Sequence, residues 1–98
     1  MSVYVDAAMI PYGRMKMSHM LADTQEELLA MADAIGLGRH WIQHPGKPME
    51  HFDVSMVKRD MALQEGAIAM TSRQLVGIVR KKRAALTAEE ASKNVLAR

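Results

Sequence analysis

The side chains best suited to chemistry in this sequence are three aspartates and two histidines: Asp6, His19, Asp23, His51 and Asp53. Carboxylate and imidazole groups can hold a divalent metal ion that activates water, or they can transfer protons as general acids and bases. Each lies at a predicted strand end or helix start, or on a strand. In open α/β sheets ligands gather outside the strand ends. The sequence therefore predicts a polar cluster that binds a divalent metal ion through all five residues, or one that catalyses acid–base chemistry through His19, His51 and Asp53.

Structural explanations compete with this hypothesis. Asp23 precedes a predicted helix, where a carboxylate interacts favourably with the helix macrodipole. His19 shares a predicted strand face with Met15, Met17 and Leu21, and a histidine in such a place is more often packed and hydrogen-bonded. The spacing matches no zinc signature such as His-Glu-x-x-His. The identity of a cofactor, if there is one, stays open.

Cationic side chains form a second set of candidates, for binding anions or nucleic acid. Lys58 and Arg59 begin a predicted helix, where the macrodipole disfavours cations, and Arg14 follows Gly13 in a predicted turn. The basic run comprises Arg80, Lys81, Lys82 and Arg83. Such a run suits contacts to phosphates or to an acidic protein surface, although it lacks the interleaved aromatics of base stacking. Solvated helix surfaces are the alternative explanation for these cations.

The elements that must position these groups follow from periodicity and capping signals. Strands are predicted at residues 3–5, 15–22, 40–43 and 67–70, with a loop over 44–50. Helices are predicted at residues 25–35 and 56–65, after residue 71, and again from residue 87. Three segments fit the capping box, in which a threonine is followed three residues later by Glu or Gln: Thr24–Glu27, Thr71–Gln74 and Thr87–Glu90.

Interleaved strands and helices predict an α/β fold with a small mixed sheet of three or four strands, covered by helices. The length of 98 residues is that of one domain. We place this domain at residues 1–80 and a basic helical extension at residues 81–98. The charge supports this division, because residues 1–72 hold six Lys and Arg against nine Asp and Glu, a net of −3. Residues 73–98 hold seven against two, a net of +5.

Composition limits the setting in which the chain works. There is no cysteine, so disulfides and thiolate metal sites are excluded. No apolar stretch approaches the roughly 18–20 residues of a membrane span, and the N-terminus lacks the features of a signal peptide. We therefore expect a cytoplasmic protein without membrane contact. The ten methionines suit either an irregular core or an adaptable binding surface.

An ordered series of short motifs resembles one family. The motifs are Val3-Tyr4-Val5-Asp6, Tyr12-Gly13-Arg14, Ser18 to Thr24 with Glu27-Leu28, Ile35-Gly36-Leu37, Trp41-Ile42-Gln43, His51-Phe52-Asp53, Lys58-Arg59 and Gly66-Ala67. Over about residues 3–80 the chain is similar to the domain-of-unknown-function 4031 family, small proteins of bacteria and their phages. It departs from the family at Leu29, where a histidine often follows Glu-Leu, and in a longer loop at residues 44–50. The family has no established activity, so the resemblance implies a fold and boundaries only.

Two functions remain as hypotheses, and the sequence does not decide whether the protein is an enzyme. The first is a phage-type accessory protein without catalysis, which binds a host protein or nucleic acid through its basic tail and methionine-rich surface. If phage-encoded, it would act in the host cytoplasm. The alternative is a metal-assisted or acid–base hydrolase, or a ligand-binding domain, for a phosphate-bearing substrate. Small size and the family resemblance favour the first, and the polar cluster favours the alternative. A homo-oligomer is left open, since sites can form between subunits.

Overall fold

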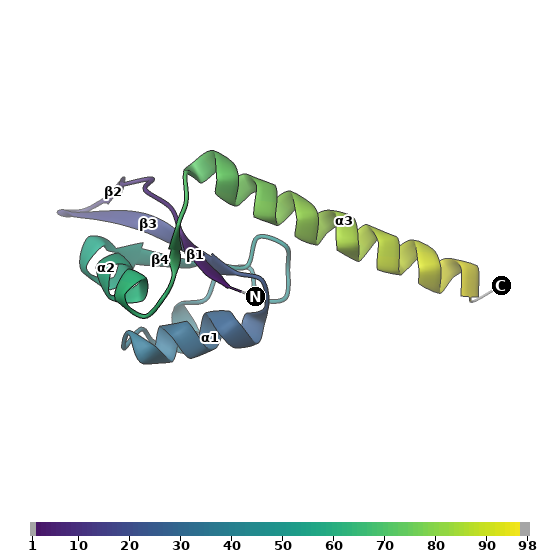
Figure 1. The fold of residues 1–98 in the computed structure, drawn as a ribbon, viewed down its shortest axis with the longest axis horizontal. Coiled ribbons are helices and arrows are strands. Elements are labelled where there is room, and N and C mark those ends of the chain that lie inside the picture. The colour runs from purple at the N-terminus through teal and green to yellow at the C-terminus, as the bar shows by residue number, and fades with distance from the viewer. Residues whose placement is uncertain (1, 97–98) are drawn as a thin grey trace.

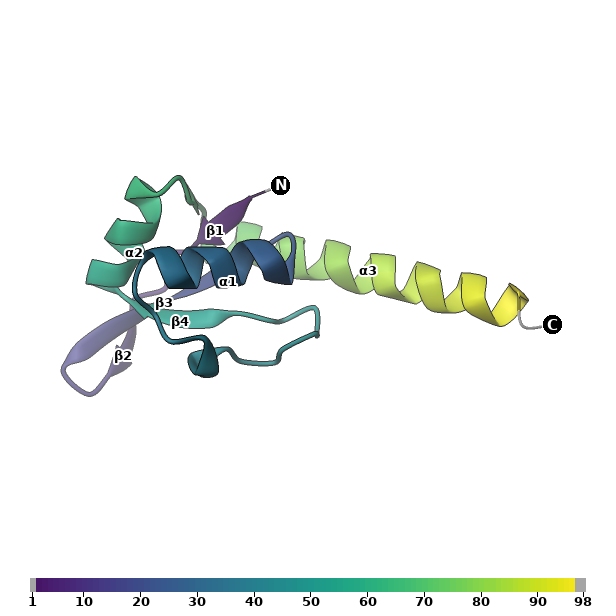
Figure 2. The same cartoon turned by 90° about the horizontal axis from the view of Figure 1, so that it is seen from below.

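Helices cover both faces of a single β-sheet in the structure, a computed structural model that describes residues 2–96. The elements in chain order are β1 (Val3–Val5), β2 (Ile10–Tyr12), β3 (Met15–Ala22), α1 (Gln25–Ala34), the 3-10 helix η1 (Arg39–Trp41), β4 (Phe52–Ser55), α2 (Met56–Gln64), β5 (Ile68–Ala69) and α3 (Ser72–Leu96). Figures 1 and 2 show α1 and α2 on one face of the sheet and α3 across the other. The predicted α/β fold is confirmed.

The sheet is mixed, as predicted, but it has five strands and not three or four. Strand β3 is its centre, antiparallel to β1, β2 and β4, whereas β5 is parallel to β1. Strands β2 and β4 were not predicted. Strand β2 contains Pro11, which lacks the N–H that a ladder needs and is tolerated on an edge strand. Strand β4 ends at Ser55, directly before α2, so its residues were interpreted as the segment that leads into the helix.

The strand predicted over residues 40–43 is wrong. This segment forms η1, and its only β-type pairing within the described residues is an isolated bridge between Gln43 and His51. The predicted loop over residues 44–50 is confirmed as a series of turns. The apolar character of Ile42 reflects packing of a connection against the body, since Ile42 packs on the main core, whereas Trp41 is exposed.

A bulge separates β1 from β2, which both pair with β3. Val5 pairs with Met20, and Ile10 pairs with Met17, so residues 6–9 on one side oppose only residues 18–19 on the other. Bulges bend the strand and redirect side chains. Here the bulge keeps the Asp6 N–H on the His19 carbonyl, at 3.1 Å, and turns the Asp6 carboxylate toward the same residue.

Alternation along β3 separates two clusters of apolar side chains. Met20 and Ala22 belong to the main core, which faces α1 and α2 and includes Leu28, Ile35, Phe52 and Val54. Leu21 points to the other face and packs with Tyr4 and Leu75 in a much smaller cluster beneath α3. His19 is two residues before Leu21 on β3, so its side chain points to the same face. It therefore lies on the thinly covered α3 face, where a polar side chain keeps access to solvent.

The predicted starts of the first three helices are confirmed by their caps. The Thr24 hydroxyl accepts from the Glu27 N–H at the start of α1, and Ser55 caps α2 in the same way. Thr71 accepts from the Gln74 N–H at the start of α3. At the end of α1, Gly36 has a φ of 71°, the left-handed conformation that ends a helix without a side-chain clash.

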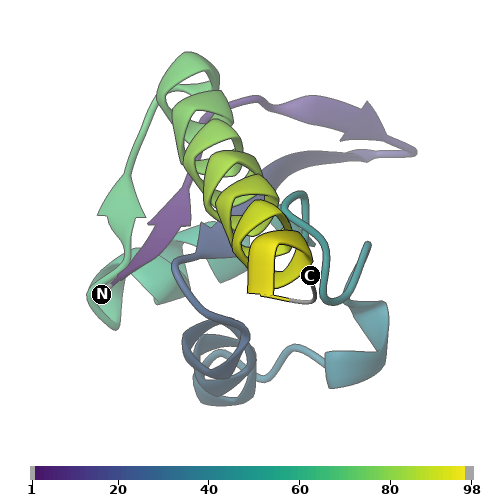
Figure 3. The ribbon, with the colours of Figure 1, turned by 90° about the vertical axis from the view of Figure 1, so that its right-hand side faces the viewer.

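Helix α3 is continuous, so the separate terminal helix predicted from residue 87 is wrong. The Thr87 hydroxyl donates to the Arg83 carbonyl at 3.0 Å inside the helix, a bond within one turn and not a cap. The first turns of α3 pack on the sheet, and the rest extends beyond the body (Figures 1 and 3). The longest dimension, 54 Å, is accordingly about twice the others, 25 and 24 Å. Residues 97 and 98 of the predicted extension lie outside the described residues, within which no helix has the length and apolarity to cross a membrane.

Candidate functional site

The register of the sheet brings three of the five predicted cluster residues together. His19 on β3 lies directly opposite Asp53 on β4, and His51 lies two residues before Asp53, on the same face of its strand. The Asp53 Oδ1 is 4.0 Å from the Nε2 of His19 and 3.4 Å from the Nε2 of His51. The two imidazole rings meet edge to face, with centroids 5.4 Å apart.

Each imidazole ring has a hydrogen-bond acceptor at Nδ1, its outer nitrogen, while Nε2 is the nitrogen on the side of Asp53. The Nδ1 of His51 lies 2.6 Å from the carbonyl oxygen of Met49, and the Nδ1 of His19 lies 2.8 Å from the Oδ2 of Asp6. A carbonyl and an ionised carboxylate can only accept, so each Nδ1 carries the proton. In the neutral form of each ring, Nε2 then carries the lone pair on the side of Asp53, which is the tautomer that a metal ligand or a general base requires.

Asp6 is buried behind His19 and orients it. Only 1% of Asp6 is exposed. Its carboxylate accepts from the His19 N–H at 2.8 Å, from the Ala8 N–H at 3.3 Å and from the Ser72 hydroxyl at 3.3 Å, besides the imidazole. Burial by itself raises the pKa of Asp6, but the hydrogen bonds from His19 and Ala8 outweigh burial and lower the pKa. Asp6 thus supports a ligand and is not itself among the facing groups.

The three facing groups have the composition of a metal site. One ligand atom from each of His19, His51 and Asp53 lies within 4.8 Å of the other two. Two imidazole nitrogens and a carboxylate oxygen suit Zn²⁺ and also Fe²⁺ or Mn²⁺. The carboxylate and carbonyl on the outer nitrogens are the usual partners of metal-bound histidines. Gln43 donates to Asp53 Oδ2, which fixes the carboxylate with Oδ1 toward the histidines.

Two cavities border this group. A cavity of about 170 Å³ beneath α3 is lined by Asp6, His19, Leu21, Met49, His51, Ser72, Leu75, Val76 and Val79. A second cavity, of about 320 Å³, is lined by Met15, Met17, Leu37, Trp41, Gln43 and Asp53. Three protein ligands leave coordination positions open, which is the pattern of catalytic and not of structural zinc sites.

The model of one protein family, described as a protein of unknown function, DUF4031, matches residues 3–82. The chain belongs to the DUF4031 family. No curated protein and no solved structure matches it at a significant level. The matched span contains all five strands, α1 and α2, and the part of α3 that covers the site, so every residue of the three-residue group lies within the DUF4031 domain.

The DUF4031 domain holds Asp23 away from this group. Asp23 follows the opposite end of β3, where it accepts from the Ser2 N–H at 2.8 Å and from the Tyr4 hydroxyl at 2.9 Å. Burial and the hydrogen bond to Asp23 raise the pKa of Tyr4. Asp23 therefore anchors β1 through these hydrogen bonds and does not lie with the other residues of the predicted cluster.

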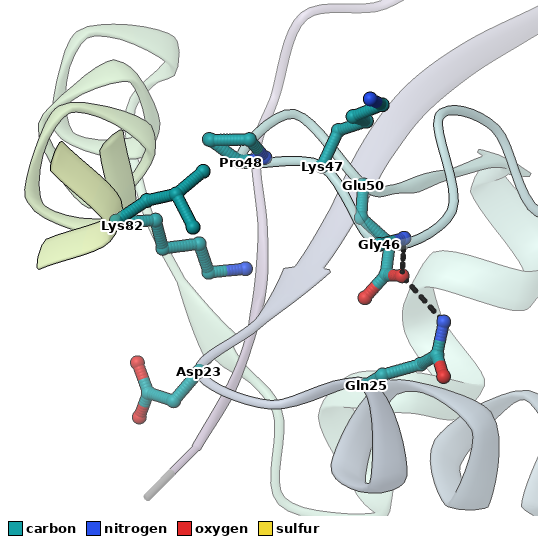
Figure 4. A pocket seen from close by; sticks show the side chains of 8 residues that line it. Asp23, Gln25, Gly46, Lys47, Pro48, Glu50 and Lys82 are labelled. Carbon is teal, nitrogen blue, oxygen red and sulfur yellow. Dashed lines mark hydrogen bonds between the residues drawn. The ribbon is translucent and has the colours of Figure 1, made fainter. Parts of the chain in front are cut away.

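Asp23 instead borders a separate hollow of about 290 Å³ between α3 and the loop before β4 (Figure 4). Lys82 extends into it toward Glu50, whose buried carboxylate accepts from the Gln25 side chain and the Gly46 N–H, both at 2.7 Å. Burial lowers the pKa of Lys82, and the nearby carboxylates of Glu50 and Asp23 offset this only in part. Lys82 is half-buried against the body, whereas Arg80, Lys81 and Arg83 of the basic run are exposed.

The predicted anion-binding cations have different surroundings. The Lys58 amino group donates to the Ile35 carbonyl at the end of α1, at 2.6 Å, and Arg59 donates to the Asp6 carbonyl in the bulge, at 2.6 Å. These contacts give a structural reason for cations in the first turn of α2. Arg14 is exposed in the hairpin turn between β2 and β3. On α3 the exposed members of the basic run are Arg80, Lys81 and Arg83. Anion binding by any of these residues stays a prediction.

Sequence reasoning missed the supporting residues Gln43, Met49 and Ser72. The bridge between Gln43 and His51 places the glutamine beside Asp53. The His-x-Asp alternation could have indicated a shared strand face, had residues 51–54 been interpreted as a strand. Met49 contributes a backbone carbonyl, and Ser72 arrives from a distant helix, so no local pattern could have indicated either contact.

Proposed function

We propose that this domain binds a divalent metal ion through His19, His51 and Asp53 and hydrolyses a phosphate ester. The observation that carries the proposal is that two imidazoles, each with a hydrogen-bond acceptor at Nδ1, present both Nε2 atoms to one oxygen of Asp53. Metal-bound histidines use the same arrangement, with one ring nitrogen on the ion and the other on a carboxylate or carbonyl oxygen.

The reaction follows from the chemistry of such an ion. Bound at the three ligands, it would lower the pKa of a water molecule and draw charge from a phosphoryl oxygen. The water oxygen bonds to phosphorus, the bond from phosphorus to the ester oxygen breaks, and the proton lost by the water reaches the departing alcohol. In this scheme Asp6 and Gln43 act on the ligands and do not touch the substrate.

The charge of α3 supports phosphate esters as the substrate class. Leu75, Val76 and Val79 of this helix form a wall of the cavity that His19 and His51 share. The same helix continues into the exposed side chains of Arg80 and Lys81. Cations near a reaction centre raise the local concentration of anionic substrates.

Thermal unfolding of the full chain with Zn²⁺ or Mn²⁺ tests the metal site. A ligand at 100 times its Kd stabilises the native state by about 2.7 kcal/mol, so wild type should melt several degrees higher with the ion. His51→Ala and Asp53→Asn should lose this increase, and His40→Ala, which alters an exposed histidine outside the group, should keep it. A wild-type melting temperature that no divalent ion raises at millimolar concentration would refute the metal site.

Hydrolysis of p-nitrophenyl phosphate and bis-p-nitrophenyl phosphate tests the reaction. Wild type should release p-nitrophenolate, chelation should abolish the release, and the ion should restore it. Turnover that persists in the chelator but disappears in His51→Ala would instead support the acid–base alternative without a metal.

A second candidate function is non-catalytic binding of nucleic acid or a host protein through α3. The observation in its favour is that α3 carries Arg80, Lys81 and Arg83 exposed on a helix that extends past the body (Figure 1). The two candidates are compatible, because the metal ligands lie on the sheet and the cations on the helix.

A further inference from the structure

An apolar cavity with one exposed aromatic ring adjoins the carboxylate of the proposed metal site. It has a volume of about 320 Å³, and Asp53 lies in its wall together with Met15, Met17 and Trp41. Trp41 is 63% exposed and Met15 49% exposed. This volume is at the lower end of the roughly 300–1,000 Å³ of small-molecule sites. A ligand in it could therefore reach the metal position with one end and the indole with the other.

The indole packs against the preceding residue of its own connection. The His40 ring packs beside it, with centroids 4.9 Å apart and the planes inclined by 41°. Gly38 makes room for this arrangement, because a Cβ there would meet the His40 ring at 2.5 Å. A ring placed in advance costs little entropy when a ligand stacks on it.

The neutral polar group of this cavity is the amide of Gln43, which lies beside Asp53. One N–H of the amide donates to Asp53, so its second N–H and its carbonyl oxygen, an acceptor, remain for a ligand. The cavity thus combines an indole face and two thioethers, which both attract aromatic rings, with an acceptor suited to a ring N–H or an amino group. An aliphatic chain would leave the acceptor unused.

We infer that this cavity takes a nucleobase, which makes the substrate a nucleotide. The inference rests on the proposed function for the phosphate end, because the phosphate ester would lie at the metal beside Asp53 while the base stacks on Trp41. A free nucleotide and a base at the end of a nucleic-acid strand share this chemistry.

Trp41 makes the test specific, since it is the only tryptophan in the chain. Its fluorescence is followed while the full-length protein is titrated with adenosine, adenosine 5′-monophosphate or ribose 5-phosphate, each with Zn²⁺ and with a chelator. Calorimetry gives the affinities for wild type, for Trp41→Ala and for the matched control Val57→Ala, an exposed apolar residue that lines neither cavity.

Adenosine should quench Trp41 equally in wild type and in His51→Ala, because the base site does not include the metal. With Zn²⁺, adenosine 5′-monophosphate should bind wild type at least tenfold more tightly than ribose 5-phosphate. Trp41→Ala should lose roughly five- to 150-fold in affinity for the nucleotide, the range measured for loss of base stacking. It should keep the Zn²⁺ affinity of wild type, and Val57→Ala should match wild type throughout.

Absence of quenching by adenosine at millimolar concentration overturns the inference whatever the metal result. So does equal affinity of wild type and Trp41→Ala for the nucleotide. Failure of Zn²⁺ to bind overturns the proposed function alone, since adenosine quenching would still be observed. An oligo-dA that binds more tightly than the mononucleotide identifies a strand as the source of the base, and the reverse order identifies a free nucleotide.

Discussion

Asp6 is the residue on which the orientation of His19 depends. Its carboxylate is buried, and it joins three segments, since it accepts from the bulge at Ala8, from β3 at His19 and from α3 at Ser72. An ionised group in such a place is tolerated only because these donors replace its hydration. The same bonds that keep the carboxylate ionised also fix the imidazole, so folding and ligand geometry are coupled at one side chain.

Asp6→Asn should weaken metal binding by about tenfold to hundredfold, the usual effect of altering the partner of a metal-bound histidine. The amide keeps an oxygen acceptor and nearly the same shape, so the fold should persist, but the charge that makes His19 a better ligand is lost. Zn²⁺ affinity by calorimetry measures the effect, and circular dichroism verifies the fold.

Asp33→Asn is the matched control, because Asp33 is exposed and pairs with Arg39 on the surface, at 2.6 Å. It should leave Zn²⁺ affinity unchanged. If Asp6→Asn also binds Zn²⁺ as wild type does, while remaining folded, then Asp6 has a structural role only and the orienting role is wrong.

At the scale of elements, the helix caps show which parts of the fold are determined locally. Thr24→Ala removes the acceptor for the Glu27 N–H and should cost about 1 kcal/mol of unfolding free energy. Thr87→Ala is the control, because Thr87 lies inside α3 and caps nothing, so alanine should be neutral there. Urea unfolding followed by circular dichroism measures both. A loss at Thr87 as large as that at Thr24 would mean that a separate helix does begin there.

The predictions from the sequence succeeded where the signal was local. The capping boxes at Thr24 and Thr71 indicated helices that the structure contains. The box at residue 87 failed because the same pattern inside a longer helix lets the hydroxyl bond to the preceding turn. Strands β2 and β4 are three and four residues long. Strand β2 pairs with β3 in a local hairpin but contains Pro11, which disfavours a strand. Strand β4 pairs with a part of β3 more than 30 residues away, which no short window of sequence contains.

The candidate site was predictable in its residue types and not in its arrangement. His19, His51 and Asp53 come together through the register of β3 and β4. Asp23 was grouped with them because it lies at a strand-to-helix junction, but that junction is at the end of β3 that pairs with the start of β1. The unfavourable position of Lys58 was a genuine signal, and its cause is the Ile35 carbonyl.

At the scale of the whole molecule, charge and shape are divided in the same way. Residues 1–79 hold seven Lys and Arg against nine Asp and Glu, a net of −2, and residues 80–98 hold six against two, a net of +4. The helix that carries the positive part extends away from the acidic body (Figure 1). A polyanion would therefore be attracted to the projecting helix and repelled by the body, so it would approach the protein from the α3 end.

Neutralising two exposed cations of α3 tests this binding in the full chain. Each phosphate contact adds about 0.9 to the slope of log affinity against log salt on duplex DNA. Arg80→Gln combined with Arg83→Gln should therefore lower the slope by about 2 and weaken binding most at low salt. Lys82 is left unchanged because it is half-buried beside Glu50. Fluorescence anisotropy of a labelled duplex over a range of salt concentrations measures the slope.

The control removes the same charge elsewhere. Lys16→Gln combined with Lys47→Gln lowers the net charge equally, but these exposed side chains lie on β3 and in the loop before β4. If the helix itself is the binding element, only the α3 variant should change the slope, because counterion release counts phosphates in contact and not the total charge. Equal changes in both variants would mean that attraction is diffuse and that α3 has no special part in it. Wild-type affinity that does not vary with salt would remove nucleic acid as the partner and leave a protein surface as the ligand of α3.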